Sequence, residues 1–254
     1  MKNTNWLVLI VATLVSAALR IWQNISGFDE AGLSVGGVCS LLLPALLAVV
    51  AVYFVWDARR LPPRSEHSAD FAESHDFSAA APLIPVVAGS FLVLLSAVAQ
   101  MAGGKSQRFP LLALGGLRLP LAAVPAALGG LCALYAVLCL RRGTELSGPV
   151  LLGPVCCLLV YVVFLYRADA ADPVLAHIYV EILASAALTL AWLERSAFAF
   201  RNGAPRLYLP LSELAALLSL TAAVDLRSLP SALLYAGCAL GELGFLLAWK
   251  TPEQ

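Results

Sequence analysis

Charged residues are scarce in this chain of 254 residues: Lys, Arg, Asp and Glu together make up 13%, with 16 basic and 16 acidic side chains. An ordinary soluble domain has about 25% charged residues, and a soluble fold of this size has too much surface to bury an interior this apolar. The charges also leave no positive excess to neutralise phosphate groups. The composition therefore excludes a typical soluble domain and a nucleic-acid partner.

Motifs for catalysis are missing as well. The chain has no G-x-x-x-x-G-K-[ST] nucleotide loop, no H-E-x-x-H metalloprotease motif and no G-x-S-x-G nucleophile elbow. Its six cysteines lie in apolar stretches and form no C-x-x-C pair, which is typical of small apolar side chains rather than metal ligands. We predict that the protein is not an enzyme and holds no metal and no cofactor.

Apolar residues, by contrast, make up 61% of the chain, and the mean hydropathy is +0.86. A helix needs about 20 apolar residues to cross a bilayer, and the backbone must be helical there because lipid cannot satisfy its polar groups. Eight segments fit: Trp6–Trp22, Leu33–Trp56, Ala81–Ala102, Leu119–Leu140, Pro149–Tyr166, Val174–Leu193, Leu207–Val224 and Pro230–Trp249. We predict an all-α polytopic membrane protein with about eight transmembrane helices in a single domain, 1–254.

The distribution of basic residues predicts the orientation in the membrane. If the N-terminus is cytoplasmic, ten of the sixteen Lys and Arg residues lie on the cytoplasmic side, Arg195 among them. This satisfies the positive-inside rule and places both termini in the cytoplasm, in the cell membrane. The first segment has features of a cleaved signal peptide, but we expect an uncleaved helix whose Arg20 extends to the membrane surface.

The two halves of the chain, 1–140 and 149–254, share landmarks in the same order. The matching pairs are Trp56-Asp57-Ala58-Arg59 with Trp192-Leu193-Glu194-Arg195, Leu94-Leu95-Ser96 with Leu217-Leu218-Ser219, and Leu119-Pro120 with Leu229-Pro230. With four helices per half, this pattern predicts a 4+4 parallel tandem repeat, an arrangement found in some carriers. The alternative is that helices of similar composition resemble one another by chance.

Four ionisable residues lie inside the predicted spans of the second half: His177, Glu181, Glu213 and Glu242. A charged side chain in mid-membrane costs about 2.5–3.5 kcal/mol on insertion scales, so such residues are functional candidates. His177 and Glu181 are four residues apart and therefore share one helix face. Together the four predict the substrate or ion site of a small-solute secondary carrier, or of the membrane subunit of a transporter. This interpretation requires the carboxylates to line a shared cavity.

The alternative is a non-catalytic membrane scaffold, sensor or assembly partner, in which the same carboxyl groups only hold helices together. The motif Gly237-x-x-x-Gly241 and the small residues Ala122, Ala126 and Gly130 predict close helix packing, within the bundle or in a homodimer. The expected partners are the lipid bilayer, a small molecule or ion, and a second copy or a partner membrane subunit.

Two connecting segments stand out. Residues 57–80 are polar and contain His67 and His75, and we expect a flexible, solvated cytoplasmic loop. The apolar run between Arg108 and Arg118 is too short to span the membrane and predicts an interfacial or re-entrant piece.

Overall fold

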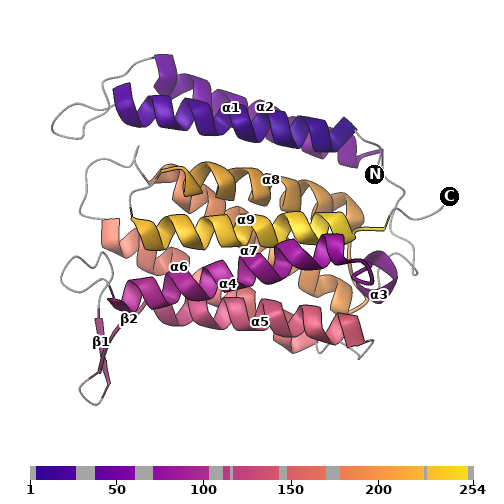
Figure 1. Cartoon of the computed structure of the whole chain (residues 1–254). Helices are drawn as coiled ribbons and strands as arrows, with labels where there is room; N and C mark the ends of the chain where they lie inside the picture. Colours follow the sequence, from indigo (N-terminus) through magenta and orange to yellow (C-terminus); the bar gives the residue numbers. More distant parts are fainter. Residues whose placement is uncertain are drawn as a thin grey trace.

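The computed structural model describes residues 4–26, 38–60, 71–102, 111–114, 117–142, 148–169, 178–225 and 228–250. Long helices run side by side through this part of the chain, and each predicted span corresponds to one of them (Figure 1). They are α1 Thr4–Ser26, α2 Val38–Ala58, α4 Ala80–Ala102, α5 Ala123–Arg142, α6 Gly148–Asp169, α7 Tyr179–Ala199, α8 Pro205–Ala223 and α9 Leu229–Ala248. The helix α3, Phe71–Ser74, and the strands β1, Leu111–Leu114, and β2, Leu117–Pro120, are short.

Six of these helices are long and apolar enough to cross a membrane: α1, α2, α4, α6, α7 and α9. This confirms the prediction of a helical protein of the multi-pass membrane type. The apolar part of α5 is shorter, Ala123–Cys139. Helix α8 is not among the six, and it carries polar residues such as Arg206, Ser212 and Glu213. The number of eight transmembrane helices therefore stays a prediction.

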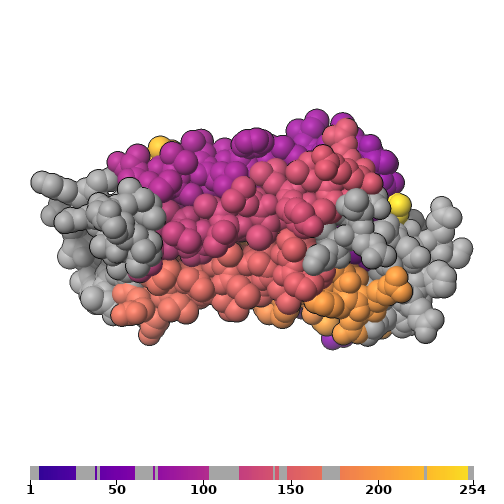
Figure 2. Space-filling view, turned by 90° about the horizontal axis from the view of Figure 1, so that it is seen from below, coloured from indigo at the N-terminus to yellow at the C-terminus, as the bar shows by residue number. Residues whose placement is uncertain are grey.

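Helices α4 to α9 form a closed ring in sequence order. Each packs against the next, and α9 returns to pack along α4 in the most extensive helix contact of the described structure. The hairpin of α1 and α2 lies outside this ring and packs on α8, as the upper layer of Figure 1 shows. The opposite face, seen in Figure 2, is formed largely by α4, α5 and α6.

Glycine residues bring α4 and α9 close together. A Cβ atom on Gly237 would lie 2.6 Å from the carbonyl oxygen of Gly89, and one on Gly89 would lie 2.8 Å from the backbone nitrogen of Gly241. Likewise, a Cβ on Gly130 of α5 would lie 3.2 Å from the carbonyl oxygen of Ser90. The small-residue patterns therefore serve packing within the chain, one of their two predicted roles.

The two halves of the chain do not pack alike. Helix α7 packs along α8, whereas the corresponding helix of the first half, α2, packs on α8 and not extensively on α4. The first half is thus divided between the ring and the outer hairpin. The 4+4 repeat of residues 1–140 and 149–254 stays a prediction from the sequence landmarks.

The structure describes part of both connecting segments. Within residues 57–80, the expectation of a solvated loop is wrong for Phe71, His75 and Phe77, which are buried; His67 lies outside the described residues. In the other segment, β1 and β2 pair antiparallel with Leu111 opposite Pro120 and form a hairpin beyond one end of the helices (Figure 1). Its inner backbone groups pair across the two strands, and its position relative to the membrane, interfacial or re-entrant, stays a prediction.

Candidate functional site

A buried ion pair crosses the interior of the helix ring. Arg195, near the end of α7, donates two hydrogen bonds to Glu242 of α9, from Nη1 to Oε1 at 3.1 Å and from Nη2 to Oε2 at 2.6 Å. The exposed fractions of the two side chains are 0% and 1%. Such a two-pronged pairing of guanidinium and carboxylate is the strongest common form of an ion pair. It joins two helices that are not neighbours in the ring.

Aromatic rings surround the guanidinium group of Arg195. Its central carbon lies 3.8 Å from the ring centre of Phe245, 4.4 Å from that of Trp192 and 5.6 Å from that of Tyr208. Cation–π attraction therefore adds to the pairing with Glu242. The Nε atom of Arg195 is buried and has no hydrogen-bond partner within the described part of the chain.

The burial of Arg195 corrects the sequence interpretation, which counted it with the cytoplasmic charges. Hydropathy places an arginine at the end of an apolar run in the aqueous phase, and it does not reveal a partner 47 residues away. One signal was present: Glu242 lies in the middle of an apolar helix, where a carboxylate needs a cationic or hydrogen-bonding partner. Arg195 lies at the end of a span on the same predicted side of the membrane.

The expectation for Arg20 is also wrong. Instead of extending to the membrane surface, the side chain of Arg20 is completely buried and pairs with Asp225, which follows α8. Its Nε and Nη2 atoms lie 2.5 Å and 2.7 Å from the two carboxylate oxygens, and Nη1 donates to Gln23 at 2.8 Å. This second pair fastens α1 to the ring.

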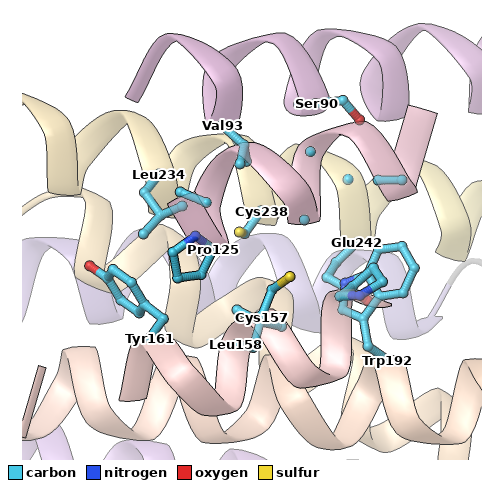
Figure 3. A pocket seen from close by; sticks show the side chains of 18 of the residues that line it. Ser90, Val93, Pro125, Cys157, Leu158, Tyr161, Trp192, Leu234, Cys238 and Glu242 are labelled. Atoms are coloured by element: carbon cyan, nitrogen blue, oxygen red, sulfur yellow. The ribbon is translucent and has the colours of Figure 1, made fainter. Parts of the chain in front are cut away.

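A small cavity lies inside the ring, between α4, α5, α6, α7 and α9. Its volume is about 60 Å³, and Glu242 contributes to its wall. Figure 3 shows Glu242 and Trp192 at one end, Tyr161 and Leu234 at the other, and the thiol groups of Cys157 and Cys238 between them. The volume suits a few water molecules and is well below the roughly 300–1,000 Å³ of typical ligand pockets.

Missing side chains create this space. Five glycines line the cavity: Gly89, Gly129, Gly130, Gly237 and Gly241. A Cβ atom on Gly241 would meet no other atom within 4 Å, so Gly241 borders open volume directly beside Glu242 in the sequence of α9. The cavity is therefore a consequence of the same residues that allow α4 and α9 to approach each other.

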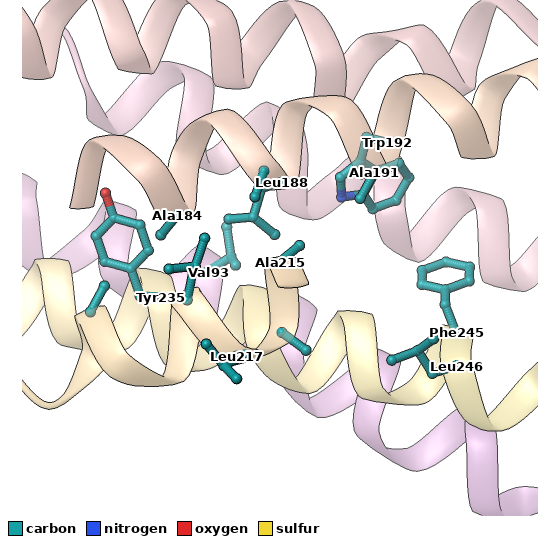
Figure 4. Close-up of a cluster of buried hydrophobic side chains, with 14 of the residues drawn as sticks. Val93, Ala184, Leu188, Ala191, Trp192, Ala215, Leu217, Tyr235, Phe245 and Leu246 are labelled. Carbon is teal, nitrogen blue, oxygen red and sulfur yellow. The ribbon is translucent and has the colours of Figure 1, made fainter. Parts of the chain in front are cut away.

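The other predicted site residues lie elsewhere. Glu181 of α7 and Glu213 of α8 are buried, with exposed fractions of 0% and 3%, but neither is among the residues that line the cavity. Tyr235, whose hydroxyl donates to the backbone carbonyl of Glu181 at 3.1 Å, lies at the end of the apolar core opposite to Trp192 and Phe245 (Figure 4).

Of the three candidates that the structure describes, only Glu242 therefore lines the cavity. His177 lies outside the described residues, so its predicted pairing with Glu181 on one helix face is not observed. The carrier interpretation required the carboxylates to line a shared cavity, and among the described residues only Glu242 does so; its partner Arg195 is not one of the lining residues. A role for Glu181 and Glu213 at this site stays a prediction.

A cap segment, residues Phe71–Phe77, covers the end of the ring where Arg195 lies. The ring of His75 stacks on Phe71 with centres 4.3 Å apart, and its Nε2 atom lies 3.1 Å from the hydroxyl oxygen of Tyr208. Backbone hydrogen bonds fix the segment to the end of α9: Asp76 donates to Ala248 at 2.7 Å, and Lys250 donates to Ser74 at 2.8 Å.

Burial dominates the chemistry of His75 in this cap. Desolvation, reinforced by the positive charge of Arg195, lowers the pKa of His75 to about 3, so the imidazole is neutral at physiological pH. The sequence interpretation placed His75 in a solvated loop. The aromatic residues Phe71 and Phe77 on either side of it were the available signal that this part of the loop packs against the protein.

The fold and the site define a helical protein of the multi-pass membrane type, with a buried ion pair beside a small internal cavity. Comparison of the chain with models of protein families, with curated proteins and with solved structures finds no match. The functional argument therefore rests on the geometry of the site.

Proposed function

We propose that the protein is a secondary carrier for a small solute, or the membrane subunit of such a carrier. The observation that supports this is the position of Glu242, which lines a cavity inside the ring and is paired with the buried Arg195. Because Glu181 and Glu213 do not line this cavity, the proposal rests on Glu242 alone. The proposed binding site consists of this cavity and the ion pair. Glu181, Glu213 and His177 are retained as candidates for a proton or ion path toward it.

The ion pair has the properties of a switch between two helix arrangements. A buried ion pair contributes little net stability compared with well-packed apolar residues, because both groups lose their hydration. A substrate charge, or a proton on Glu242, would weaken the pairing and change the preferred spacing of α7 and α9. A ligand that acts differently on two arrangements shifts their populations, which is what a carrier requires.

In the proposed cycle, a cavity of this small volume corresponds to a closed arrangement. A solute larger than a few water molecules requires the ring to widen. The cap segment closes the ring at the end near Arg195, where Phe77 packs against Phe245 with ring centres 5.4 Å apart. Phe245 itself lines the cavity, so a displacement of the cap would reach the cavity wall through this one side chain.

A non-catalytic scaffold is the second candidate, and specific observations favour it. Glu181 and Glu213 are buried away from the cavity, and the Arg20–Asp225 pair joins helices without lining the cavity. Buried polar groups therefore serve packing elsewhere in this fold. In the scaffold interpretation, Arg195 and Glu242 do the same.

Uptake into vesicles separates the two candidates. The purified protein is reconstituted with an imposed pH gradient, and the entry of radiolabelled choline, lactate, uridine and decanoate is measured. Glu242→Gln removes the charge in the cavity wall, whereas Asp225→Asn disrupts the buried pair that lies outside it and serves as the matched control. Both variants are compared at equal amounts of folded protein.

We expect the wild type and Asp225→Asn to take up at least one of the four solutes faster than protein-free vesicles do. Glu242→Gln should fall to the level of protein-free vesicles for that solute. Equal uptake by the two variants, or no uptake of any of the four by the wild type, contradicts the proposal and favours the scaffold.

A further inference from the structure

A second, larger cavity opens on the outer surface between α5 and α6. Its volume is about 340 Å³, within the range of ligand pockets, and the residues that line it are apolar, among them Leu128, Val160 and Phe164. Helices α5 and α6 both contribute to the face of the molecule shown in Figure 2. We refer to it as the α5–α6 groove.

The surroundings of the α5–α6 groove at membrane depth are hydrocarbon. Helix α6 has a hydropathy of 2.4 over its candidate span, the highest of the six candidate spans. Leu128 and Val160 are 50% and 44% exposed, so the groove opens away from the ring interior. An apolar groove on the surface of a membrane-spanning segment faces lipid chains, and a water-soluble solute finds no polar group in its lining.

The groove and the inner cavity share part of their walls. Pro125 and Cys157 line both of them, so these two residues form a common part of the walls of the lipid-facing groove and the inner cavity. Pro125 lies in the first turn of α5, where its missing N–H breaks no helix hydrogen bond. Pro154, inside α6, also lines the inner cavity.

We propose that the acyl chain of a membrane phospholipid lies in the α5–α6 groove and extends past Pro125 and Cys157 into the inner cavity, toward Glu242. This inference rests on the proposed function for the role of the site. It narrows the substrate class to an amphiphile whose hydrocarbon chain enters sideways from the bilayer. The inner cavity is lined mostly by apolar side chains, which suit the end of a hydrocarbon chain, with Glu242 at one end.

Photocrosslinking in vesicles tests the path. The protein is reconstituted with phosphatidylcholine that carries a diazirine near the end of one acyl chain, irradiated, and digested, and the modified residues are identified by mass spectrometry. We expect adducts on Leu234, Cys238 or Glu242 of α9, which line the inner cavity, as well as on the exposed surface of α5 and α6. Adducts confined to exposed surface residues overturn the proposal.

Two residues of α6 supply a matched pair of variants. Cys157→Phe fills the shared wall and should abolish the adducts on α9, while Leu159→Phe, at an exposed residue that lines neither the groove nor the inner cavity, should preserve them. Adducts on α9 that persist in Cys157→Phe contradict this path. A parallel sample with a diazirine-bearing free fatty acid identifies the source, and α9 adducts with that probe alone contradict a phospholipid occupant.

The outcomes separate this proposal from the carrier proposal, because crosslinking requires no transport. Uptake that depends on Glu242 without α9 adducts leaves the carrier and removes the lipid path. Adducts on α9 without uptake leave a lipid-binding site and remove the carrier.

Discussion

Separating Arg195 from Glu242 should destabilise the protein strongly, whereas replacing both should not. Each single substitution, Arg195→Met or Glu242→Leu, leaves the other member of the pair charged and without its partner. That remaining side chain is buried, since Arg195 is 0% exposed and Glu242 is 1% exposed. Removing one member of a buried pair typically costs about 3–5 kcal/mol. The double variant leaves no unpaired charge, so its loss is limited to the attraction between Arg195 and the aromatic rings, up to about 2 kcal/mol.

The measurement is the free energy of unfolding in mixed detergent micelles for the wild type, both single variants and the double variant. The double-mutant cycle then gives the coupling energy of the pair directly. Arg60→Gln is the control, since Arg60 is 64% exposed and lies 3.7 Å from Asp57, and exposed pairs contribute at most about 1 kcal/mol.

Two results would refute this reasoning. One is a single variant at position 195 or 242 that loses no more stability than Arg60→Gln, which would mean that the pair is solvated in the protein. The other is a double variant that loses as much as the sum of the two single variants, which would mean that the two charges are not coupled.

The remaining predictions concern the glycine contacts and the cap. Gly237→Ala should destabilise the protein by about 1–3 kcal/mol through overpacking against Gly89, whereas Gly241→Ala, with open space for its methyl group, should be neutral or stabilising by up to about 1 kcal/mol; equal effects in unfolding measurements would contradict the α4–α9 contact. Because the pKa of His75 falls from 6.5 to about 3 on folding, the unfolded chain binds the proton more tightly, so stability is full above about pH 6.5 and decreases as the pH falls toward 3. Melting temperatures measured from neutral pH downward should show this loss in the wild type and a smaller loss in His75→Gln, and identical pH profiles would show that His75 is not buried in neutral form.

The helices were predictable from the sequence because one physical requirement, about 20 apolar residues for a bilayer, determines them. Their starts were less accurate. Apolar residues continue outside the helices, and the prediction therefore started one of the spans too early, at Leu119. In the structure the corresponding helix begins at Ala123, and Leu119 and Pro120 belong to β2. Hydropathy measures the affinity of a segment for lipid and contains no information on where the helical hydrogen bonds begin.

The candidate site was predictable only in part. Glu242 stood out because a carboxylate in an apolar helix needs a partner, but the identity of the partner depends on how α7 and α9 face each other across the ring. The burial of His75 depends on the docking of the cap segment onto the end of α9, which backbone hydrogen bonds near Ala248 and Lys250 fix. Such contacts between distant segments are set by tertiary packing, and a single sequence does not specify them.

The ratio of uptake by Glu242→Gln to uptake by Asp225→Asn tests the central claim most directly, because both variants disrupt a buried ion pair and, of the two carboxylates, only Glu242 lines the cavity. Measured in vesicles with equal amounts of folded protein, and corrected for protein-free vesicles, the ratio should be close to zero. A ratio close to one would show that the cavity and its charge pair have no part in transport.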